Sequence, residues 1–269
     1  MQPPFPCPTA TWHNDTYEAI DPKKAEHSQA GKTVIITGAG SGIGRETAHA
    51  FAEAGAKHFV LIGRTEATLR ETESSFPFKP ESVSVFATSV TDETAIRKIA
   101  AIVGTWDVLV LNAAHISPPS TIAQTPLNEW WQDYEVNVKS VVIAAQAFIP
   151  TANKGAAIYG INAGAHALPP AFTPLLSGYL SSKVAQMKVF EFIAAENPEL
   201  FVCSIHPGMI DTGIFQGSGA DKSKLPMDTL KLPAHFLVWL TQPKTKFLHG
   251  KMVFANWDVD ELSARAEEI

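Results

Sequence analysis

The chain has 269 residues, a formal net charge of −6 and 45% hydrophobic residues, which is enough apolar material for one sizeable buried core. No segment is densely basic, and no uncharged apolar run approaches the roughly 18 residues that a membrane helix needs, so neither a nucleic-acid nor a membrane partner is expected. Two cysteines, Cys7 and Cys203, form no disulfide framework, and the histidines show no paired-ligand spacing, so no metal site is expected. The start of the chain has no signal-peptide pattern, which makes a cytoplasmic location the expectation.

The first 30 residues differ in composition from the rest of the chain. They are rich in proline and polar residues, and they predict an irregular arm, 1–30, that Trp12, Tyr17 and Ile20 pack against the body. In the remainder, 31–269, short apolar runs alternate with segments of helical composition. Strands are predicted at 33–37, 58–62, 82–87, 107–111, 156–161, 201–205 and 251–255. Helices are predicted at 45–54, 66–75, 93–102, 126–148, 181–195 and 233–240, with a substrate loop at about 213–232.

Strict alternation of strands and helices decides the fold class. Parallel strands need crossover connections, so the pattern predicts an α/β fold: a Rossmann-type, doubly wound parallel sheet of about seven strands with helices on both faces. No linker composition interrupts the alternation, so one domain is expected over 31–269.

A glycine-rich turn, TGAGSGIG at 37–44, joins the first predicted strand to the first predicted helix. Glycines there allow a tight turn and the close approach of a pyrophosphate, and the helix start offers unpaired N–H groups to an anion. The placement at the head of a strand–helix–strand unit indicates a dinucleotide site rather than a flexible turn.

The end of the second predicted strand indicates which dinucleotide is bound. An acidic residue at this point would accept a hydrogen bond from a ribose 2′-hydroxyl, but the chain has Gly63 and Arg64 instead. Gly63 leaves room and Arg64 offers a planar guanidinium to a 2′-phosphate, which favours NADP(H) over NAD(H). The alternative is an exposed arginine at the start of a helix.

Tyr179 and Lys183 are four residues apart in a predicted helix and therefore share a face. A nearby ammonium group lowers the pKa of a phenol, so Tyr179 is expected to exchange a proton near neutral pH.

Together these motifs resemble the short-chain dehydrogenase/reductase family over about residues 30–257. The matching pieces, in chain order, are TGAGSGIG at 37–44, Asn112-Ala113-Ala114, Asn137, Tyr179 with Lys183, and Pro207-Gly208-Met209-Ile210-Asp211-Thr212. The arm at 13–17 and the tail at 256–262 further resemble a fungal branch of that family, which is often tied to small-molecule metabolism.

The resemblance implies roles for individual residues. Tyr179 would donate a proton to a substrate carbonyl, Lys183 would bind the nicotinamide ribose, and Asn137 would hold a water that relays protons to Lys183. Including Arg64, the expected cofactor site comprises Gly38, Ser41, Gly42, Ile43, Gly44, Arg64, Ser89, Val90, Asn112, Ala113, Tyr179, Lys183, Pro207, Gly208, Ile210 and Thr212. His115 would lie at the mouth of the substrate pocket. The resemblance also implies a homodimer or homotetramer paired through the helices that carry Asn137 and Tyr179.

One family residue is missing. At the end of the fifth strand the family has a serine that polarises the substrate carbonyl, and alignment on the strand places Ala163 at that position, after Asn162. The family's usual spacing before Tyr179 reaches His166 instead, so neither alignment supplies a serine. Loss of one donor to a developing oxyanion costs roughly 3–4 kcal/mol. Ser89 is a second departure, because the family often has an aspartate there that contacts adenine.

Three alternatives follow from the missing serine. Asn162 or His166 could act as the replacement donor, with NADPH-dependent reduction of a carbonyl or imine of a small metabolite retained. Tyr179 alone could suffice for an activated substrate. The site could instead have shifted to non-redox chemistry such as cyclisation, isomerisation or rearrangement. Reduction is the primary prediction and non-redox chemistry is the alternative to it.

Overall fold

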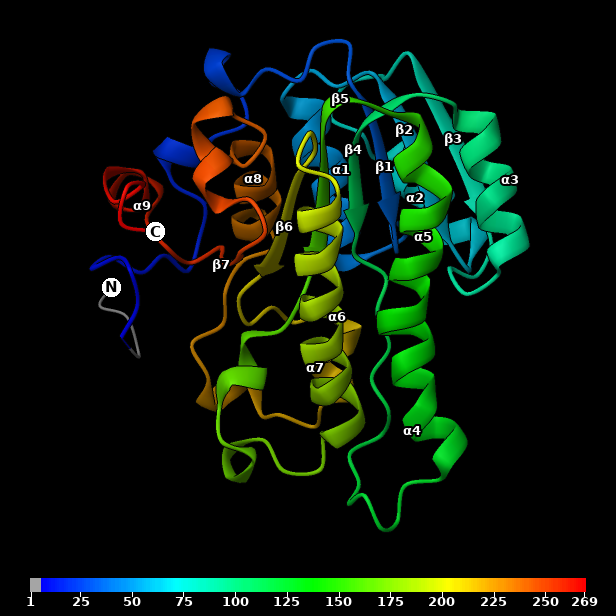
Figure 1. Ribbon diagram of the computed structural model, residues 1–269, viewed down its shortest axis with the longest axis vertical. Coiled ribbons are helices and arrows are strands. Elements are labelled where there is room, and N and C mark those ends of the chain that lie inside the picture. The colour runs from blue at the N-terminus through cyan, green and yellow to red at the C-terminus, as the bar shows by residue number, and fades with distance from the viewer. Residues whose placement is uncertain (1–5) are drawn as a thin grey trace.

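The computed structural model describes residues 6–269 and contains one seven-stranded parallel sheet in the order β3-β2-β1-β4-β5-β6-β7 (Figure 1). The strands are β1 (Thr33–Thr37), β2 (His58–Gly63), β3 (Ser82–Ala87), β4 (Trp106–Leu111), β5 (Ala152–Ile161), β6 (Phe201–His206) and β7 (Met252–Phe254). The helices are α1 (Gly42–Glu53), α2 (Glu66–Ser74), α3 (Glu93–Val103), α4 (Leu127–Tyr134), α5 (Ser140–Phe148), α6 (Ser177–Glu196), α7 (Gly213–Gly217), α8 (Lys231–Trp239) and α9 (Val259–Ala264).

The central strands are apolar on both faces because helices cover both faces. Ile35 and Ile36 are neighbours in β1 and point to opposite sides, and both are fully buried. Ile36 belongs to a core that includes Phe51 of α1 and Phe236 of α8, whereas Ile35 belongs to a second core that includes Phe148 of α5. The predicted fold class is therefore confirmed.

The strand order reverses between β1 and β4. From β1 the chain winds outward through β2 to β3, and it then returns to place β4 on the other side of β1. In doubly wound sheets a ligand binds in the crevice outside the carboxyl ends of the strands at such a reversal. Thr37 ends β1 and Leu111 ends β4, so the predicted glycine turn and the predicted Asn112 lie at this crevice.

Two predicted elements are wrong in detail. The helix predicted at 126–148 is α4 and α5 joined by a π-helical turn, Glu135–Lys139, which sequence periodicity does not reveal. The loop predicted at about 213–232 contains α7, which Thr212 caps by accepting a hydrogen bond from the Phe215 N–H, and a 3-10 turn at Lys222–Lys224. Glycine and serine disfavour a helix, but one side-chain cap suffices for a single turn.

The arm packs against the C-terminal segment. Figure 1 shows the arm as the blue chain beside the red helix α9. Trp12 pairs with Trp257 in an antiparallel bridge, and Glu261 accepts hydrogen bonds from the backbone of Ala10 and from the Thr11 hydroxyl. Residues 1–5 of the predicted arm lie outside the described residues.

Within residues 6–269, no helix is both long and apolar enough to cross a membrane. Over the same range, no three His, Cys, Asp or Glu side chains are grouped so that they could hold a metal ion.

Candidate active site

The glycine turn is packed so closely that side chains would not fit at two of its positions. Gly38 has φ +66°, and a Cβ there would lie 2.8 Å from Nδ2 of Asn112. A Cβ on Gly44 would lie 2.3 Å from the Gly38 carbonyl oxygen. Asn112 Nδ2 donates to the carbonyl oxygens of Thr37 (3.0 Å) and Gly38 (3.2 Å), which ties the end of β4 to the turn. The sequence predicts that Asn112 contacts the cofactor. In the structure its side-chain amide holds the glycine turn, residues 37–44, in its shape, and this turn forms the glycine cradle.

The start of α1 faces the crevice without a side-chain cap. Ser41 is exposed at the N-cap position and its hydroxyl caps no N–H group of the helix. The N–H groups of Gly42 and Ile43 behind it are therefore available to an anion, whereas the Arg45 N–H already donates to the Ser41 carbonyl oxygen at 3.2 Å. Gly42 has φ +52°, and a Cβ there would lie 3.3 Å from Cγ2 of Thr212, so the turn after β6 borders the same space.

Arg45 is a residue of this region that the sequence analysis missed. Its Nη2 donates to the Gly40 carbonyl oxygen (2.5 Å) and to Glu71 (2.9 Å), and its Nε donates to the Thr72 hydroxyl (3.0 Å). The guanidinium therefore braces the glycine turn against α2. In the sequence, only the position of Arg45 at the start of the predicted helix could have indicated this role. Its partners, Gly40, Glu71 and Thr72, are brought together by the fold.

Arg64 is exposed just beyond β2, before α2 begins. Within the part of the chain that the structure describes, its guanidinium has no hydrogen bond or ion pair, whereas Arg70 on α2 is paired with Glu66 and Glu73. Ser89, beyond β3, shares a hydrogen bond with the Thr91 hydroxyl at 2.8 Å.

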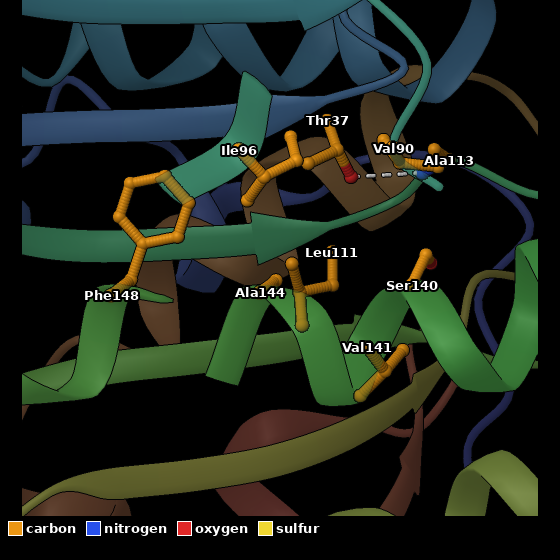
Figure 2. A pocket seen from close by; sticks show the side chains of 9 residues that line it. All are labelled: Thr37, Val90, Ile96, Leu111, Ala113, Ser140, Val141, Ala144 and Phe148. Carbon is orange, nitrogen blue, oxygen red and sulfur yellow. Dashed lines mark hydrogen bonds between the residues drawn. The ribbon is translucent and has the colours of Figure 1, made fainter. Parts of the chain in front are cut away.

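A small hollow lies between α5, α3 and the carboxyl ends of β1 and β4 (Figure 2). Two predicted cofactor-binding residues, Val90 and Ala113, line it, and the Ala113 N–H donates to the Thr37 hydroxyl at 3.1 Å. The other walls are mainly aliphatic or aromatic, from Ile96, Leu111, Val141, Ala144 and Phe148. The hollow is therefore suited to an apolar surface rather than to a phosphate.

Lys183 and Tyr179 lie on the same side of α6, with Nζ of Lys183 5.8 Å from the centroid of the Tyr179 ring. Lys183 is 1% exposed, and its Nζ donates to the Ile161 carbonyl oxygen (2.8 Å) and to Gln186 Oε1 (3.1 Å). Burial lowers the pKa of Lys183 to about 7, while the Asp133 carboxylate acts in the opposite direction.

The expected pKa shift of Tyr179 has the wrong sign. Burial raises the pKa of Tyr179 above its ordinary value, and the negative charge of Asp133 raises it further. The expectation that the Lys183 ammonium lowers this pKa is therefore not met in this structure. Lys183 is itself easily deprotonated, because burial lowers its pKa, and no sequence motif predicts a carboxylate beside the pair.

Asp133 of α4 is that unforeseen carboxylate. It is fully buried, and its oxygens accept from His115 Nδ1 (2.9 Å), the Ser117 N–H (3.0 Å) and the Ser117 hydroxyl (2.6 Å). A Cβ on Gly178 would lie 2.6 Å from Oδ2, so the carboxylate is pressed against the residue that precedes Tyr179. Asp133 and Tyr179 both line a second hollow, with Trp130 and Leu176 among its walls.

Asn137 lies fully buried in the π-helical turn. Its Oδ1 accepts from the His115 N–H (2.8 Å), and its Nδ2 donates to the His115 carbonyl oxygen (2.9 Å) and to the Ser182 hydroxyl (2.9 Å). The side-chain amide thus clamps the loop after β4 to α6. A water held by Asn137 would bind to its backbone or to the second lone pair of Oδ1, because both Nδ2 protons are already donated. π-helical turns of this kind are frequent at functional sites.

The two predicted replacement donors are both engaged elsewhere. Asn162 is 3% exposed; its Nδ2 donates to the Lys183 carbonyl oxygen (3.1 Å) and its Oδ1 accepts from the Ala163 N–H (2.7 Å). His166 lies in a 3-10 turn, Gly164–Ala167, with Nε2 3.1 Å from Sδ of Met252 on β7. Ala163 itself is buried at the end of β5.

The Asp133 charge leads to a prediction about pH. Asp133 raises the pKa of both Tyr179 and Lys183, so Asp133→Asn should lower both. Tyr179 is the proton donor expected from the sequence, and a proton donor fails when the pH rises through its pKa. The decline of activity at high pH should therefore begin at a lower pH in the variant. The asparagine can still accept from the Ser117 N–H and donate to the Ser117 hydroxyl. The control is Asp260→Asn, an exposed change of equal charge. A pH–rate profile that stays in place, or moves upward, contradicts the prediction.

Comparison with known proteins identifies the family. A family model described as short chain dehydrogenase matches residues 32–223. Short chain dehydrogenase mpl6 of Monascus purpureus is 36% identical over 96% of this chain and 93% of its own length. A short chain dehydrogenase/reductase of Claviceps purpurea is 34% identical over 98% of this chain and 91% of its own.

Solved structures share the fold. A putative short chain dehydrogenase from Pseudomonas syringae superimposes with a TM-score of 0.78 at 26% identity, covering 86% of this chain and 96% of its own. A short chain dehydrogenase from Burkholderia cenocepacia in complex with NADP has a TM-score of 0.73 at 20% identity, covering 84% of this chain and 96% of its own. The family match, the fungal relatives and the fold agree with the resemblance seen in the sequence, and the chain belongs to the short chain dehydrogenase family.

Proposed function

We propose that this protein is an NADPH-dependent reductase that acts on a carbonyl or imine group of a small metabolite, with Tyr179 as the proton donor. The observation that carries the proposal is the placement of Tyr179 and the buried Lys183 on one side of α6, at the carboxyl end of β5. Fungal relatives named as short chain dehydrogenases, at 32–36% identity, support reduction or oxidation as the reaction class.

The residues at the crevice fit a phosphorylated dinucleotide. The cradle at Gly38 and Gly44 admits no side chain, and the start of α1 has free N–H groups behind Ser41. Among residues 6–269, the Arg64 guanidinium has no hydrogen-bond or ion-pair partner. Two structural neighbours are described with NADP and with NADPH, the second being L-sorbose reductase from Gluconobacter frateurii. They share the fold at 20% and 24% identity, so the choice of cofactor rests on Arg64.

Chemically, a nicotinamide dinucleotide, when bound, supplies a hydride to the substrate carbon. Tyr179 donates its phenolic proton to a carbonyl oxygen as hydride arrives, or to an imine nitrogen, which becomes an iminium before hydride transfer. Lys183, with its pKa lowered to about 7, can then return a proton to the phenolate at neutral pH. Asn137 bonds both to the backbone of His115 and to Ser182 of α6. It therefore fixes the distance between the loop after β4 and the helix that carries Tyr179.

The missing serine affects which substrates this site can reduce. Asn162 is committed to the backbone of Lys183 and Ala163, and His166 lies against Met252, so we propose that Tyr179 acts without a second side-chain donor. An iminium or a reactive ketone needs less polarisation than a plain ketone, so an activated acceptor is the proposed substrate class.

Restoring the serine tests this assignment. Ala163→Ser should raise kcat for plain ketones by about 100- to 1000-fold, because one added donor stabilises a developing oxyanion. It should change the rate for iminium substrates much less. The measurement is NADPH oxidation at 340 nm with matched ketone and imine panels, and Ala165→Ser is the control. Equal rates for Ala163→Ser and the parent protein on ketones would mean that position 163 does not face the reacting carbonyl.

Arg64 provides a separate test of the cofactor. Arg64→Ala should weaken NADPH binding about 10- to 100-fold, since a charged hydrogen bond to a phosphate contributes about 1.5–3 kcal/mol. NADH binding should be nearly unchanged. Fluorescence titration with both nucleotides gives the two Kd values, and Arg70→Ala is the control on the neighbouring helix. A wild-type preference for NADH would overturn the assignment.

Non-redox chemistry is the second candidate, supported by the buried Ala163 and the committed Asn162. It predicts that product forms while NADPH is not consumed. Following both quantities in one reaction separates the two functions.

We propose further that the protein is cytoplasmic and forms a homodimer or homotetramer through α5 and α6. Val142 of α5 and Val184 and Phe192 of α6 are exposed, by 37%, 44% and 61%, which supports pairing of these helices.

A further inference from the structure

Asp228 lies at a junction of four segments that are far apart in the sequence. It is 9% exposed, and its Oδ1 accepts from Nδ2 of Asn14 (2.6 Å) and from Nδ2 of Asn256 (3.0 Å). Its Oδ2 accepts from the Met209 N–H at 2.6 Å. The arm, the chain after β7 and the turn after β6 therefore converge on one carboxylate at the end of the predicted substrate loop.

The turn after β6 is built around that carboxylate. Gly208 has φ +96°, and a Cβ there would lie 2.4 Å from Oδ2 of Asp228. The Asp228 N–H also donates to the Met209 carbonyl oxygen at 2.7 Å. With Met209 bonded through both its N–H and its carbonyl oxygen, Asp228 fixes the turn on two sides. The same turn continues to Thr212, whose Cγ2 borders the glycine cradle at Gly42.

Residues of the arm help to hold Asp228 and its neighbour Thr229 in place. Beside the bond from its side chain, Asn14 accepts the Thr229 N–H at 2.9 Å through its carbonyl oxygen. The next residue, Asp15, accepts a hydrogen bond from the Thr229 hydroxyl. Asn256 links to the arm as well, because its Nδ2 donates to the His13 carbonyl oxygen at 2.8 Å and its own carbonyl oxygen accepts from the His13 N–H at 2.8 Å.

We infer that Asn14 and Asp228 are positioning residues for the nicotinamide end of the cofactor, acting through the turn Pro207–Thr212. The turn follows β6, the neighbour of β5 in the sheet, and borders Gly42 at its far end, so it lies between the glycine turn and the Tyr179–Lys183 pair. The inference rests on the proposed function, in which the nicotinamide would react beside Tyr179. The arm thereby contributes to cofactor binding, although Asn14 hydrogen-bonds to Asp228 and Thr229 and acts only through them.

The experiment compares two ligands that differ in the nicotinamide end. In Asn14→Ala, a bond to a buried carboxylate is lost and the ordered turn is less populated, so the Kd for NADPH should rise about 10-fold. The Kd for 2′,5′-ADP, which has no nicotinamide, should not change. Hydrogen exchange at the Met209 N–H should become faster, because that group donates to Asp228. Asn14→Ser should behave in the same way.

The control is Thr11→Val, which removes the hydrogen bond of the Thr11 hydroxyl to Glu261 (2.6 Å), keeps the backbone bonds of the arm to Glu261, and leaves Asp228 untouched. It should bind both ligands as the parent protein does. If Asn14→Ala keeps parental NADPH affinity and parental exchange at Met209, or weakens both ligands equally, the inference is wrong while the proposed function stands. If the parent protein binds 2′,5′-ADP and not NADPH, or binds neither, the proposed function fails first.

Discussion

Tyr179→Phe is expected to lower kcat for reduction by about 10³-fold, while the Kd for NADPH stays within a factor of about two. The variant keeps the aromatic ring beside Lys183 and loses only the hydroxyl, so the proton must come from solvent. Single-turnover oxidation of NADPH measures the chemical step, and the melting temperature verifies that α6 is intact. Loss of binding together with rate would point to a structural effect instead.

The matched control is Tyr134→Phe on α4. Tyr134 stacks on Trp130 and Trp131, with ring centroids 5.1 and 5.3 Å away, and has no place in the proposed mechanism. It should retain full activity. A Tyr179→Phe variant as fast as this control would show that another group donates the proton, and His115 beside Asp133 would be the next residue to replace.

Gly44→Ala has the second largest expected effect, this time on the cradle. The added Cβ would lie 2.3 Å from the Gly38 carbonyl oxygen and 2.6 Å from the side-chain Nδ2 of Asn112. The Gly38 backbone cannot yield without moving the turn, and Asn112 Nδ2 is itself bonded to the turn. We expect a loss of about 1–3 kcal/mol in the free energy of unfolding and a loss of at least about 100-fold in NADPH affinity. Urea unfolding and a fluorescence titration measure the two effects.

Gly213→Ala is the comparison for stability, because a Cβ there meets nothing within 4 Å. It should unfold at the parental urea concentration. Parental NADPH affinity in Gly44→Ala would mean that the nucleotide does not enter this cradle, and the cofactor would have to be sought elsewhere in the crevice.

The fold could be predicted from sequence because its signals are local. Runs such as Thr33–Thr37 and Trp106–Leu111 are apolar on both faces, and their alternation with helices leaves few arrangements other than a doubly wound sheet. The π-helical turn was missed because its residues, Glu135–Lys139, have the same composition as an α-helical turn. It depends on tertiary contacts of Asn137, which no local pattern encodes.

The site could be predicted only in part, because some of its contacts are local in sequence and others are formed only by the fold. Tyr179 and Lys183 are one helical turn apart, so their proximity follows from spacing alone. Asp133 and Asp228 come close to the site from distant segments, and neither belongs to a motif with recognisable spacing. The sign of the Tyr179 pKa shift was wrong because it depends on burial and on Asp133, which are both properties of the folded chain.

The docking of the arm on α9 also bears on the order in which the chain folds. Thr11 and Glu261 are separated by 250 positions, so bringing them together closes a loop that contains nearly the whole protein. Ordering so long a loop is entropically unfavourable until the sheet between its ends has formed. During synthesis the arm should therefore be among the last segments to reach its native place, after α9 has left the ribosome.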